Sequence, residues 1–291
     1  MNKEFKLLSI ISDKLSNPNY LGDDCAYLNE YKIAISSDSL IEDVHFSMQF
    51  MTPYEIARKA LLVNISDILA SGAKPKYLTI NLSGKLDEKF INDFYNGVNS
   101  IEKEFNINII GGDITKSDKL MVAITAIGSY KNRKISSRKN AKCNYVVATV
   151  GEFGSSAQGL EDLINGVSDN YFTSYHKNPK LYPKLASKIA KETKQPYAMM
   201  DSSDGLIDCL YQISLKSNVK INIDYSKIPH KTANKEFVLY GGEDYSLIIC
   251  LSEDDFNKIN GLIKIGICSK GQGIFVDNKK INYRAYEHFI N

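Results

Sequence analysis

The sequence has no tryptophan and no CxxC pair, and its five cysteines are scattered over 291 residues. An odd number of scattered cysteines argues against a disulfide framework or a zinc site and indicates reduced thiols. No apolar run approaches the roughly 20 residues of a transmembrane helix, and residues 1–15 lack the pattern of a signal peptide. The net charge is +2, from 36 basic and 34 acidic residues, which gives no electrostatic case for nucleic-acid binding. We therefore expect a cytoplasmic protein that binds neither nucleic acid nor membranes.

Two common nucleotide-binding signatures are also missing. The sequence contains no GxxxxGK[ST] loop, which excludes a P-loop enzyme. It also lacks the HRD and DFG motifs of protein kinases. Any nucleotide chemistry in this chain must therefore use a different set of phosphate and metal ligands.

Strand-like and helix-like segments alternate along the chain, which predicts an α/β or α+β fold. The clearest helix start is at 52–55, where Thr52 can act as N-cap, Pro53 occupies the first helical position and Glu55 completes a capping box. This helix is expected to end near Gly72. The segment 131–144 is basic and has few apolar residues, so we place a boundary there between two domains, 1–137 and 138–291. In both halves, acidic or glycine-rich loops follow strands, where ligand sites of α/β folds tend to lie.

Many acidic residues sit in small-residue turns beside apolar strands rather than on lysine-rich surfaces. They are Asp23, Asp24, Asp38, Asp67, Asp113, Asp201, Asp204, Glu243 and Asp244. An unpaired carboxylate in such a place is unfavourable. Each motif taken alone fits helix capping, as for the residues at 201–204. Six such motifs in one chain favour Mg²⁺, which takes oxygen ligands and usually shares them with substrate phosphates.

Seven motifs, in this order, resemble thiamine-monophosphate kinase, a family of the aminoimidazole ribonucleotide synthetase fold group. They are GDDCA (22–26), ISSDSLIEDVHF (35–46), KALLVNISDILASGAKP (59–75), GGD (111–113), SR (137–138), DSSDGL (201–206) and GGEDY (241–245). The resemblance runs from about residue 20 to the terminal RAYEHF. It implies an N-terminal α/β domain whose sheets form a barrel across a homodimer interface, and a C-terminal α/β domain beside it. It also implies ATP-dependent phosphorylation of thiamine monophosphate to thiamine diphosphate, by direct in-line transfer with several Mg²⁺ ions in the cleft.

The resemblance assigns roles to individual residues, and none of them is a covalent catalyst. The implied magnesium ligands are Asp24, Ser37, Asp38, Asp67, Asp113, Asp201 and Asp204, assisted by Ser36. The implied ATP contacts are Gly112, Asp113, Arg138 and Ser203, and the implied thiamine phosphate contacts are His45, Glu243 and Tyr286. An arginine can fork onto phosphate oxygens, and a serine at a helix start suits a phosphate. A solvated linker arginine and a plain N-cap are the alternatives for Arg138 and Ser203.

The sequence departs from the family pattern after the SR motif, where Asn140 and Cys143-Asn144 replace the usual glycine and Gly-Asp. Other enzymes of the same fold group are the nearest alternatives: a purine-pathway cyclo-ligase, a selenophosphate synthetase or a hydrogenase-maturation dehydratase. Residues 1–24 lack the reactive cysteine of the second, and the terminal YEHFIN lacks the cysteine of the third. A non-catalytic nucleotide sensor is the alternative from another class, and it predicts loss of the metal-binding acids.

Overall fold

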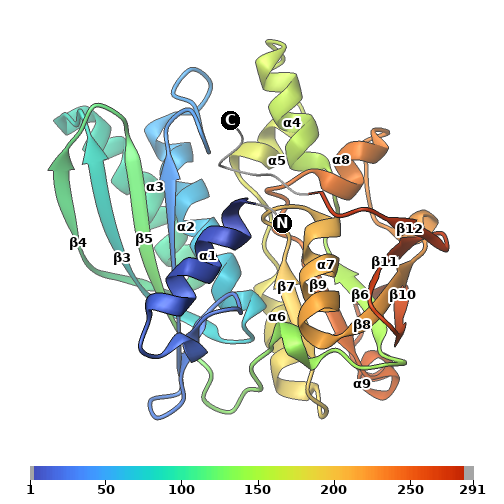
Figure 1. Cartoon of the computed structure of the whole chain (residues 1–291). Helices are drawn as coiled ribbons and strands as arrows, with labels where there is room; N and C mark the ends of the chain where they lie inside the picture. Colours follow the sequence, from blue (N-terminus) through green and yellow to red (C-terminus); the bar gives the residue numbers. More distant parts are fainter. Residues whose placement is uncertain (1–2, 285–291) are drawn as a thin grey trace.

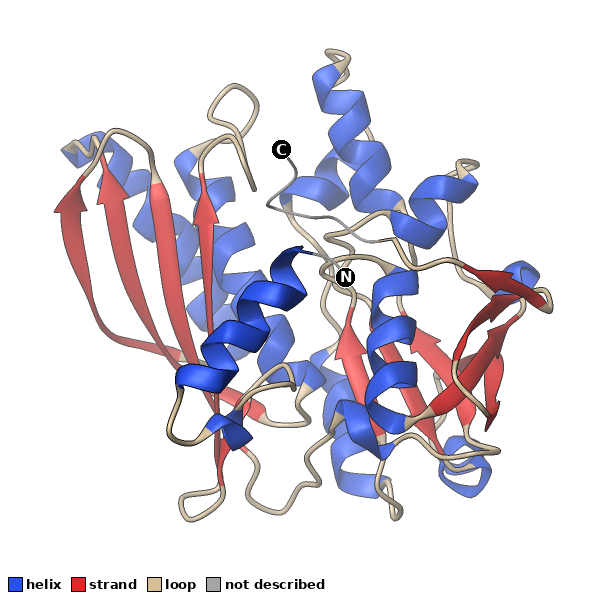
Figure 2. Cartoon of the chain, viewed as in Figure 1, coloured by secondary structure: helices blue, strands red, loops and turns tan. Residues whose placement is uncertain are grey.

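The structure is a computed structural model that describes residues 3–284. Two β-sheets lie beside each other, with helices packed on both (Figures 1 and 2). The first sheet has the order β1 (Ala26–Leu28), β2 (Ile33–Ile41), β5 (Met121–Ser129), β3 (Lys74–Gly84) and β4 (Asn108–Lys116). The second has the order β12 (Lys279–Ile281), β11 (Gly273–Val276), β8 (Val219–Ile223), β10 (Ile263–Lys270), β6 (Val146–Val150), β9 (Leu247–Leu251) and β7 (Ala198–Asp201). The mixed α/β class is therefore confirmed.

Nine α-helices surround these sheets within residues 3–284. They are α1 (Lys3–Lys14), α2 (Pro53–Ala70), α3 (Glu88–Phe105), α4 (Ser155–Ile164), α5 (Tyr171–Lys177), α6 (Pro183–Glu192), α7 (Leu206–Ser217), α8 (Lys235–Tyr240) and α9 (Glu253–Lys258). Short 3₁₀ turns cover Pro18–Tyr20, Arg138–Asn140 and Tyr225–Lys227. None of these helices combines the length and the apolarity that crossing a membrane would require.

Helix α2 begins where the capping box predicts. The Thr52 side chain accepts from the Glu55 N–H at 3.2 Å, and the Glu55 carboxylate accepts from the Thr52 N–H at 2.8 Å. The helix ends at Ala70, and Gly72 follows with a φ of +84°, a conformation that favours glycine. The predicted start and end of this helix are therefore confirmed.

Helix α2 lies between the two sheets and is buried on nearly every side. It packs against β2 and β5 of the first sheet and against β7 of the second. One continuous apolar core runs from the first sheet, through α2, to Met199 and Ile249 of the second. Polar side chains on α2 are therefore held where both sheets can supply partners.

The first sheet has two open edges within the described chain. Strand β1 covers β2 only from Ile33 to Ile35, and β4 has a partner only on its β3 side. Ile110 and Ile114 of β4 are 55% and 62% exposed. No sheet in residues 3–284 closes into a barrel, so the barrel expected across a dimer interface remains a prediction.

Candidate active site

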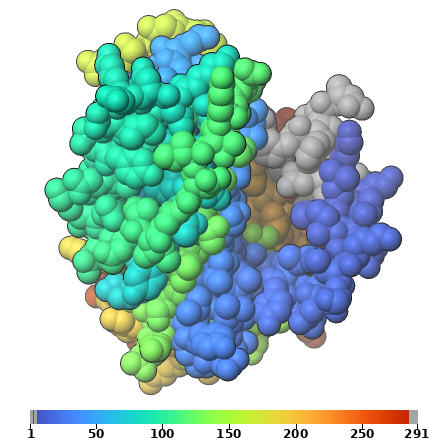
Figure 3. Space-filling view, turned by 90° about the vertical axis from the view of Figure 1, so that its left-hand side faces the viewer, coloured from blue at the N-terminus to red at the C-terminus, as the bar shows by residue number. Residues whose placement is uncertain are grey.

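A cavity of about 830 Å³ lies between the two halves of the chain. Its walls come from the segment 20–26, strand β2 with its following loop, helix α2, the segment after β7, and the GGEDY segment. In the space-filling view of Figure 3 the surface is hollowed between β2 and α1, and the C-terminal half forms the floor. The volume suits a small-molecule site.

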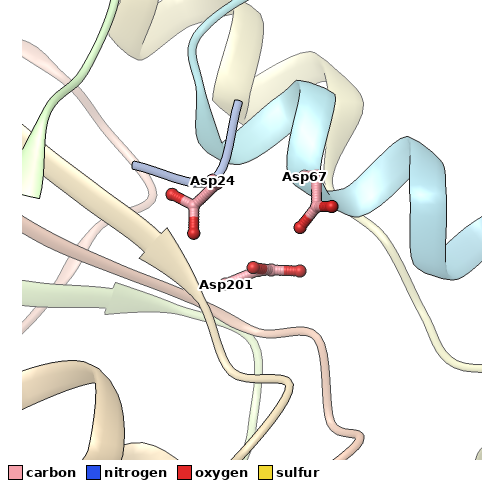
Figure 4. A group of neighbouring side chains, drawn as sticks. All are labelled: Asp24, Asp67 and Asp201. Atoms are coloured by element: carbon pink, nitrogen blue, oxygen red, sulfur yellow. The ribbon is translucent and has the colours of Figure 1, made fainter. Parts of the chain in front are cut away.

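Three carboxylates meet in this cavity. Asp24 follows Gly22 in the GDDCA loop, Asp67 comes from α2, and Asp201 ends β7. One oxygen of each lies within 4.8 Å of the others, and Figure 4 shows the three side chains pointing toward one another. The sequence predicts all three as metal ligands, and the fold brings them together from segments more than 40 residues apart.

The electrostatics of this group favour protonation or a bound cation. Burial raises the pKa of Asp201 to about 7, and the nearby Asp24 charge adds to the effect. Burial and the carboxylates of Asp201, Asp38 and Asp24 raise the pKa of Asp67 well above its ordinary value. Burial also raises the pKa of Asp24, against the opposing effect of Arg138. Crowded carboxylates with raised pKa values are frequent at functional sites.

Few positive groups reach these carboxylates. Within residues 3–284, one ion pair does so, between Arg138 Nη2 and Asp24 Oδ1 at 2.7 Å. Ser36 Oγ donates to Asp67, and Ser66 Oγ donates to Asp201. The donor set is entirely oxygen, which fits a hard divalent cation such as Mg²⁺ better than a transition metal.

Most other predicted site residues line the same cavity. They are Ser36, Ser37, Asp38, His45, Arg138, Ser203, Asp204 and Glu243. The Asp38 N–H donates to Asn64 Oδ1 of α2 at 3.2 Å. Ser37, on the opposite face of β2, donates its hydroxyl to the Ile124 carbonyl at 3.1 Å. Ser36 and Ser37 therefore differ in their contacts: Ser36 hydrogen-bonds a carboxylate of the three-aspartate group, whereas the Ser37 hydroxyl bonds a backbone carbonyl.

Comparison with known proteins agrees with this arrangement. Residues 22–130 match the family described as AIR synthase related protein, N-terminal domain. The thiamine-monophosphate kinase of Aquifex aeolicus is 30% identical, with 98% of each chain covered. That of Bacillus subtilis is 35% identical, covering 81% of this chain and 78% of that protein. The chain belongs to the thiamine-monophosphate kinase family. A solved structure described as AaThiL complexed with AMPPCP and TMP has a TM-score of 0.90 at 29% identity, covering 98% of this chain and 97% of that one.

Two residues that the thiamine-monophosphate kinase resemblance assigns to ATP lie away from the cavity. Gly112 and Asp113 are on the exposed edge strand β4. Asp38 pairs with Ile124, Ile124 with Ile80, and Ile80 with Gly112. Three strand spacings amount to roughly 14 Å. Within one chain, the fold therefore does not bring Asp113 to Asp38, and Tyr286 lies outside the described residues.

Arg138 is held by its surroundings despite the altered loop that follows it. Its backbone N–H and the Ser137 hydroxyl both donate to Asp23 Oδ1, at 2.8 and 3.0 Å. Its Nη1 donates to Gln212 of α7. Its Nε is buried and has no hydrogen-bond partner among the described residues. A buried, unsatisfied donor fits an anion that binds next to it.

Helix capping explains some of the acidic motifs, but not the three-aspartate group. Asp23 accepts from the backbone N–H of Arg138 at the start of the 3₁₀ turn 138–140, whose N-cap is Ser137. Asp244 accepts from the N–H groups of Gly154 and Ser156 at the start of α4, at 2.5 and 2.9 Å. At α7, by contrast, the N-cap is Gly205, which has no side chain to cap the helix. Asp201 is therefore not a cap.

Two polar residues at the site were not predicted, Lys59 and His176. Both are buried, at 0% and 2% exposure, and the Lys59 ammonium lies 3.1 Å from the Glu243 carboxylate. The sequence signal for Lys59 is a lysine directly before the apolar run ALLV (60–63). His176 on α5 carries no comparable signal in the sequence.

Proposed function

We propose that this protein is a thiamine-monophosphate kinase, which transfers the γ-phosphoryl group of ATP to thiamine monophosphate and releases ADP and thiamine diphosphate. The observation that carries the proposal is the group of Asp24, Asp67 and Asp201 in a cavity that His45 and Glu243 also line. Family membership and a relative whose structure contains AMPPCP and TMP support the same reaction. We place the enzyme in the cytoplasm, with residues 1–137 as the ATP, metal and dimerisation domain and 138–291 as the second domain.

In this proposal Asp24, Asp67 and Asp201 would hold Mg²⁺, together with Asp38, Asp204, Ser36 and Ser37. Bound Mg²⁺ neutralises phosphate charge during phosphoryl transfer. This neutralisation matters here because both reactants are anions and repel each other. Two unit charges about 4 Å apart repel by roughly 4 kcal/mol at an effective dielectric constant near 20. Arg138 Nε and Ser203 add donors for the ATP phosphates.

His45 fits a positioning role for the acceptor phosphate rather than a role as phosphoryl carrier. Its Nδ1 accepts the Ile41 N–H at 3.1 Å. A neutral imidazole that accepts at Nδ1 carries its proton on Nε2. That N–H can donate to a phosphate oxygen, whereas a nucleophilic nitrogen would have to be unprotonated. This tautomer supports our proposal of direct transfer between the two bound phosphates.

A second copy of the chain would complete the site. The open edge of β2 beyond Ile35 and the open edge of β4 could pair across a two-fold axis and close the first sheets into a barrel. Such pairing covers the exposed Ile110 and Ile114 and sets Asp113 of one copy beside Asp38 of the other. We therefore propose a homodimer in which Gly112 and Asp113 serve the ATP site of the opposite copy.

The direct test is ADP release by the purified protein. Release should require thiamine monophosphate and Mg²⁺ together, and free thiamine should support little turnover. Equal activity on free thiamine would remove the monophosphate specificity. No release with either acceptor would refute the kinase assignment and favour another enzyme of the fold group or a nucleotide sensor.

A further inference from the structure

Lys59 is a fully buried lysine that lies behind His45 and Glu243, two residues that line the cavity. It lies on α2 eight residues before Asp67, a distance of about 12 Å along a helix axis. Its side chain is 0% exposed. Its ammonium donates to the His45 carbonyl at 3.1 Å and lies 3.1 Å from both oxygens of Glu243. A buried charge requires such partners.

His176 provides the third partner of the ammonium. Its Nε2 lies 3.4 Å from Lys59 Nζ, and its Nδ1 lies 3.0 Å from Ser156 Oγ. Burial and the Lys59 charge lower the pKa of His176 to about 4, so the ring is neutral at neutral pH. A neutral ring that accepts at Nε2 donates from Nδ1 to Ser156. The three N–H bonds of Lys59 are thus directed at His45, Glu243 and His176, all within the protein.

Glu243 is the charged partner that faces the cavity. Its backbone has a φ of +63°, and its N–H donates to the Ser203 carbonyl at 2.7 Å. Its side chain is 26% exposed. Burial alone would raise the pKa of this carboxyl, but the charge and the hydrogen bond of Lys59 outweigh burial and hold the pKa below its ordinary value. The carboxylate therefore stays ionised in the wall of the cavity.

We propose that Lys59 is a positioning residue for the acceptor substrate. One ammonium ties together three segments that are far apart in sequence: the loop at His45, the GGEDY segment at Glu243 and helix α5 at His176. It fixes the two residues assigned to thiamine phosphate and keeps Glu243 charged, without touching the substrate itself. The inference rests on the proposed function. Its effect should be confined to the acceptor, because the aspartate group lies two helical turns away.

The test is the Lys59→Met variant, which keeps the length of the side chain and removes the charge. The KM for thiamine monophosphate should rise about tenfold to a hundredfold, the scale of a lost charged hydrogen-bond network. The KM for ATP should change less than about threefold. The matched control is Arg58→Met, on the neighbouring residue of the same helix. Arg58 binds Asn178, Ser100 and Glu104 away from the cavity, so this variant should lose stability while keeping the acceptor KM.

A second variant separates positioning from folding. Lys59→Met leaves the partly buried Glu243 carboxylate without its counter-charge and should lower the melting temperature. Lys59→Met/Glu243→Gln removes that unpaired charge, so the melting temperature should recover, while the acceptor KM should stay above that of Glu243→Gln alone, which measures the loss of the Glu243 carboxylate itself. Recovery of both would show that Lys59 acts only through folding. An unchanged acceptor KM in Lys59→Met, or equal increases for both substrates, would also overturn the inference.

Measurements on the wild-type protein distinguish a failure of the proposed function from a failure of the role proposed for Lys59. If it produces no ADP with thiamine monophosphate, the proposed function itself fails. Titration calorimetry of thiamine monophosphate into the wild type and Lys59→Met, each with Mg²⁺ and AMPPCP, makes the comparison without turnover. A wild type that binds and turns over the acceptor, beside a Lys59→Met variant with the same affinity, would refute the role of Lys59 alone.

Discussion

Asp201→Asn should stabilise the metal-free protein while it inactivates the enzyme. Asp201 is 2% exposed, and burial followed by the Asp24 charge raises its pKa from 3.8 to about 7. Between about pH 4 and pH 7 the folded state therefore binds more protons than the unfolded state, so stability falls as pH rises through that window. A rise of about 3 pKa units corresponds to about 4 kcal/mol at pH 8, which is an upper bound for one member of a crowded group.

Asparagine has nearly the same shape, cannot ionise, and can still accept from Ser66. In EDTA at pH 8 the variant should be more stable than the wild type by about 1–4 kcal/mol. At pH 4 the difference should largely vanish, because the wild-type carboxyl is then protonated in the folded state. Urea unfolding at the two pH values measures both quantities.

Asp255→Asn is a control that should change the stability in the opposite direction. Asp255 is also buried, but its carboxylate accepts from the N–H groups of Lys194 and Gln195, both at 3.0 Å. Burial would raise the pKa of Asp255, and these amides outweigh it and lower the pKa. Asp255→Asn should therefore lose stability at pH 8. If Asp201→Asn also lost stability at pH 8, or if its effect did not depend on pH, the idea of a crowded, unneutralised group would be wrong.

Mg²⁺ should remove most or all of the stability advantage of Asp201→Asn over the wild type. A ligand at a hundred times its Kd stabilises the folded state by about 2.7 kcal/mol, and Asp201→Asn should gain much less because it lacks one ligand. Its kinase rate should fall at least about a hundredfold. A variant with near-native activity would exclude Asp201 from the metal site.

Three further predictions concern the other assigned residues. Asp67→Asn and Asp113→Asn should each lower the rate at least about a hundredfold while the protein stays folded, as measured by steady-state kinetics and circular dichroism; near-native rates would show that these acids are surface or capping groups. Light scattering should give a dimer rather than the 32.6 kDa monomer. Mixing the inactive Asp38→Asn and Asp113→Asn proteins should restore about a quarter of the activity if each site uses both copies, because half of the dimers are then mixed and one of their two sites is intact. His45→Gln should raise the acceptor KM with some turnover remaining, and γ-labelled ATP without acceptor should leave no label on the protein; stoichiometric label that chases into thiamine diphosphate would contradict direct transfer.

Local signals made helix α2 predictable, whereas the roles of the acidic motifs depend on distant contacts. The capping box at Thr52 and Glu55 satisfies backbone groups within four residues, so the sequence contains the whole interaction. Asp244 caps a helix start 90 residues earlier in the chain. Nothing near Asp244 in the sequence distinguishes it from Asp201, which points into the aspartate group. Only the packed fold distinguishes the capping Asp244 from Asp201 of the aspartate group.

The same limit applies to Lys59 and His176, which lie 117 residues apart. A lysine in an apolar helix face signals an unusual environment, but its partners depend on where α5 packs. Gly112 and Asp113 show the opposite case. The motif assigns them to the ATP site, and the sheet order of one chain sets them on the far edge. In our proposal their role depends on a second chain, whose position the strand pattern of one chain does not give.

Helix α2 carries Asp67 near one end of the cavity and Lys59 near the other. The second half of the chain places a carboxyl group against each of them, Asp201 against Asp67 and Glu243 against Lys59. At one end Asp67 faces Asp201, and the oxygens of these two carboxyl groups lie within 4.8 Å, so that they repel when both are ionised. At the other end Lys59 faces Glu243, two opposite charges 3.1 Å apart. Without a cation, the interface between the halves is therefore attractive at the acceptor end and repulsive at the aspartate end. A divalent cation makes both ends attractive, so metal binding and the packing of the two halves on α2 must stabilise each other.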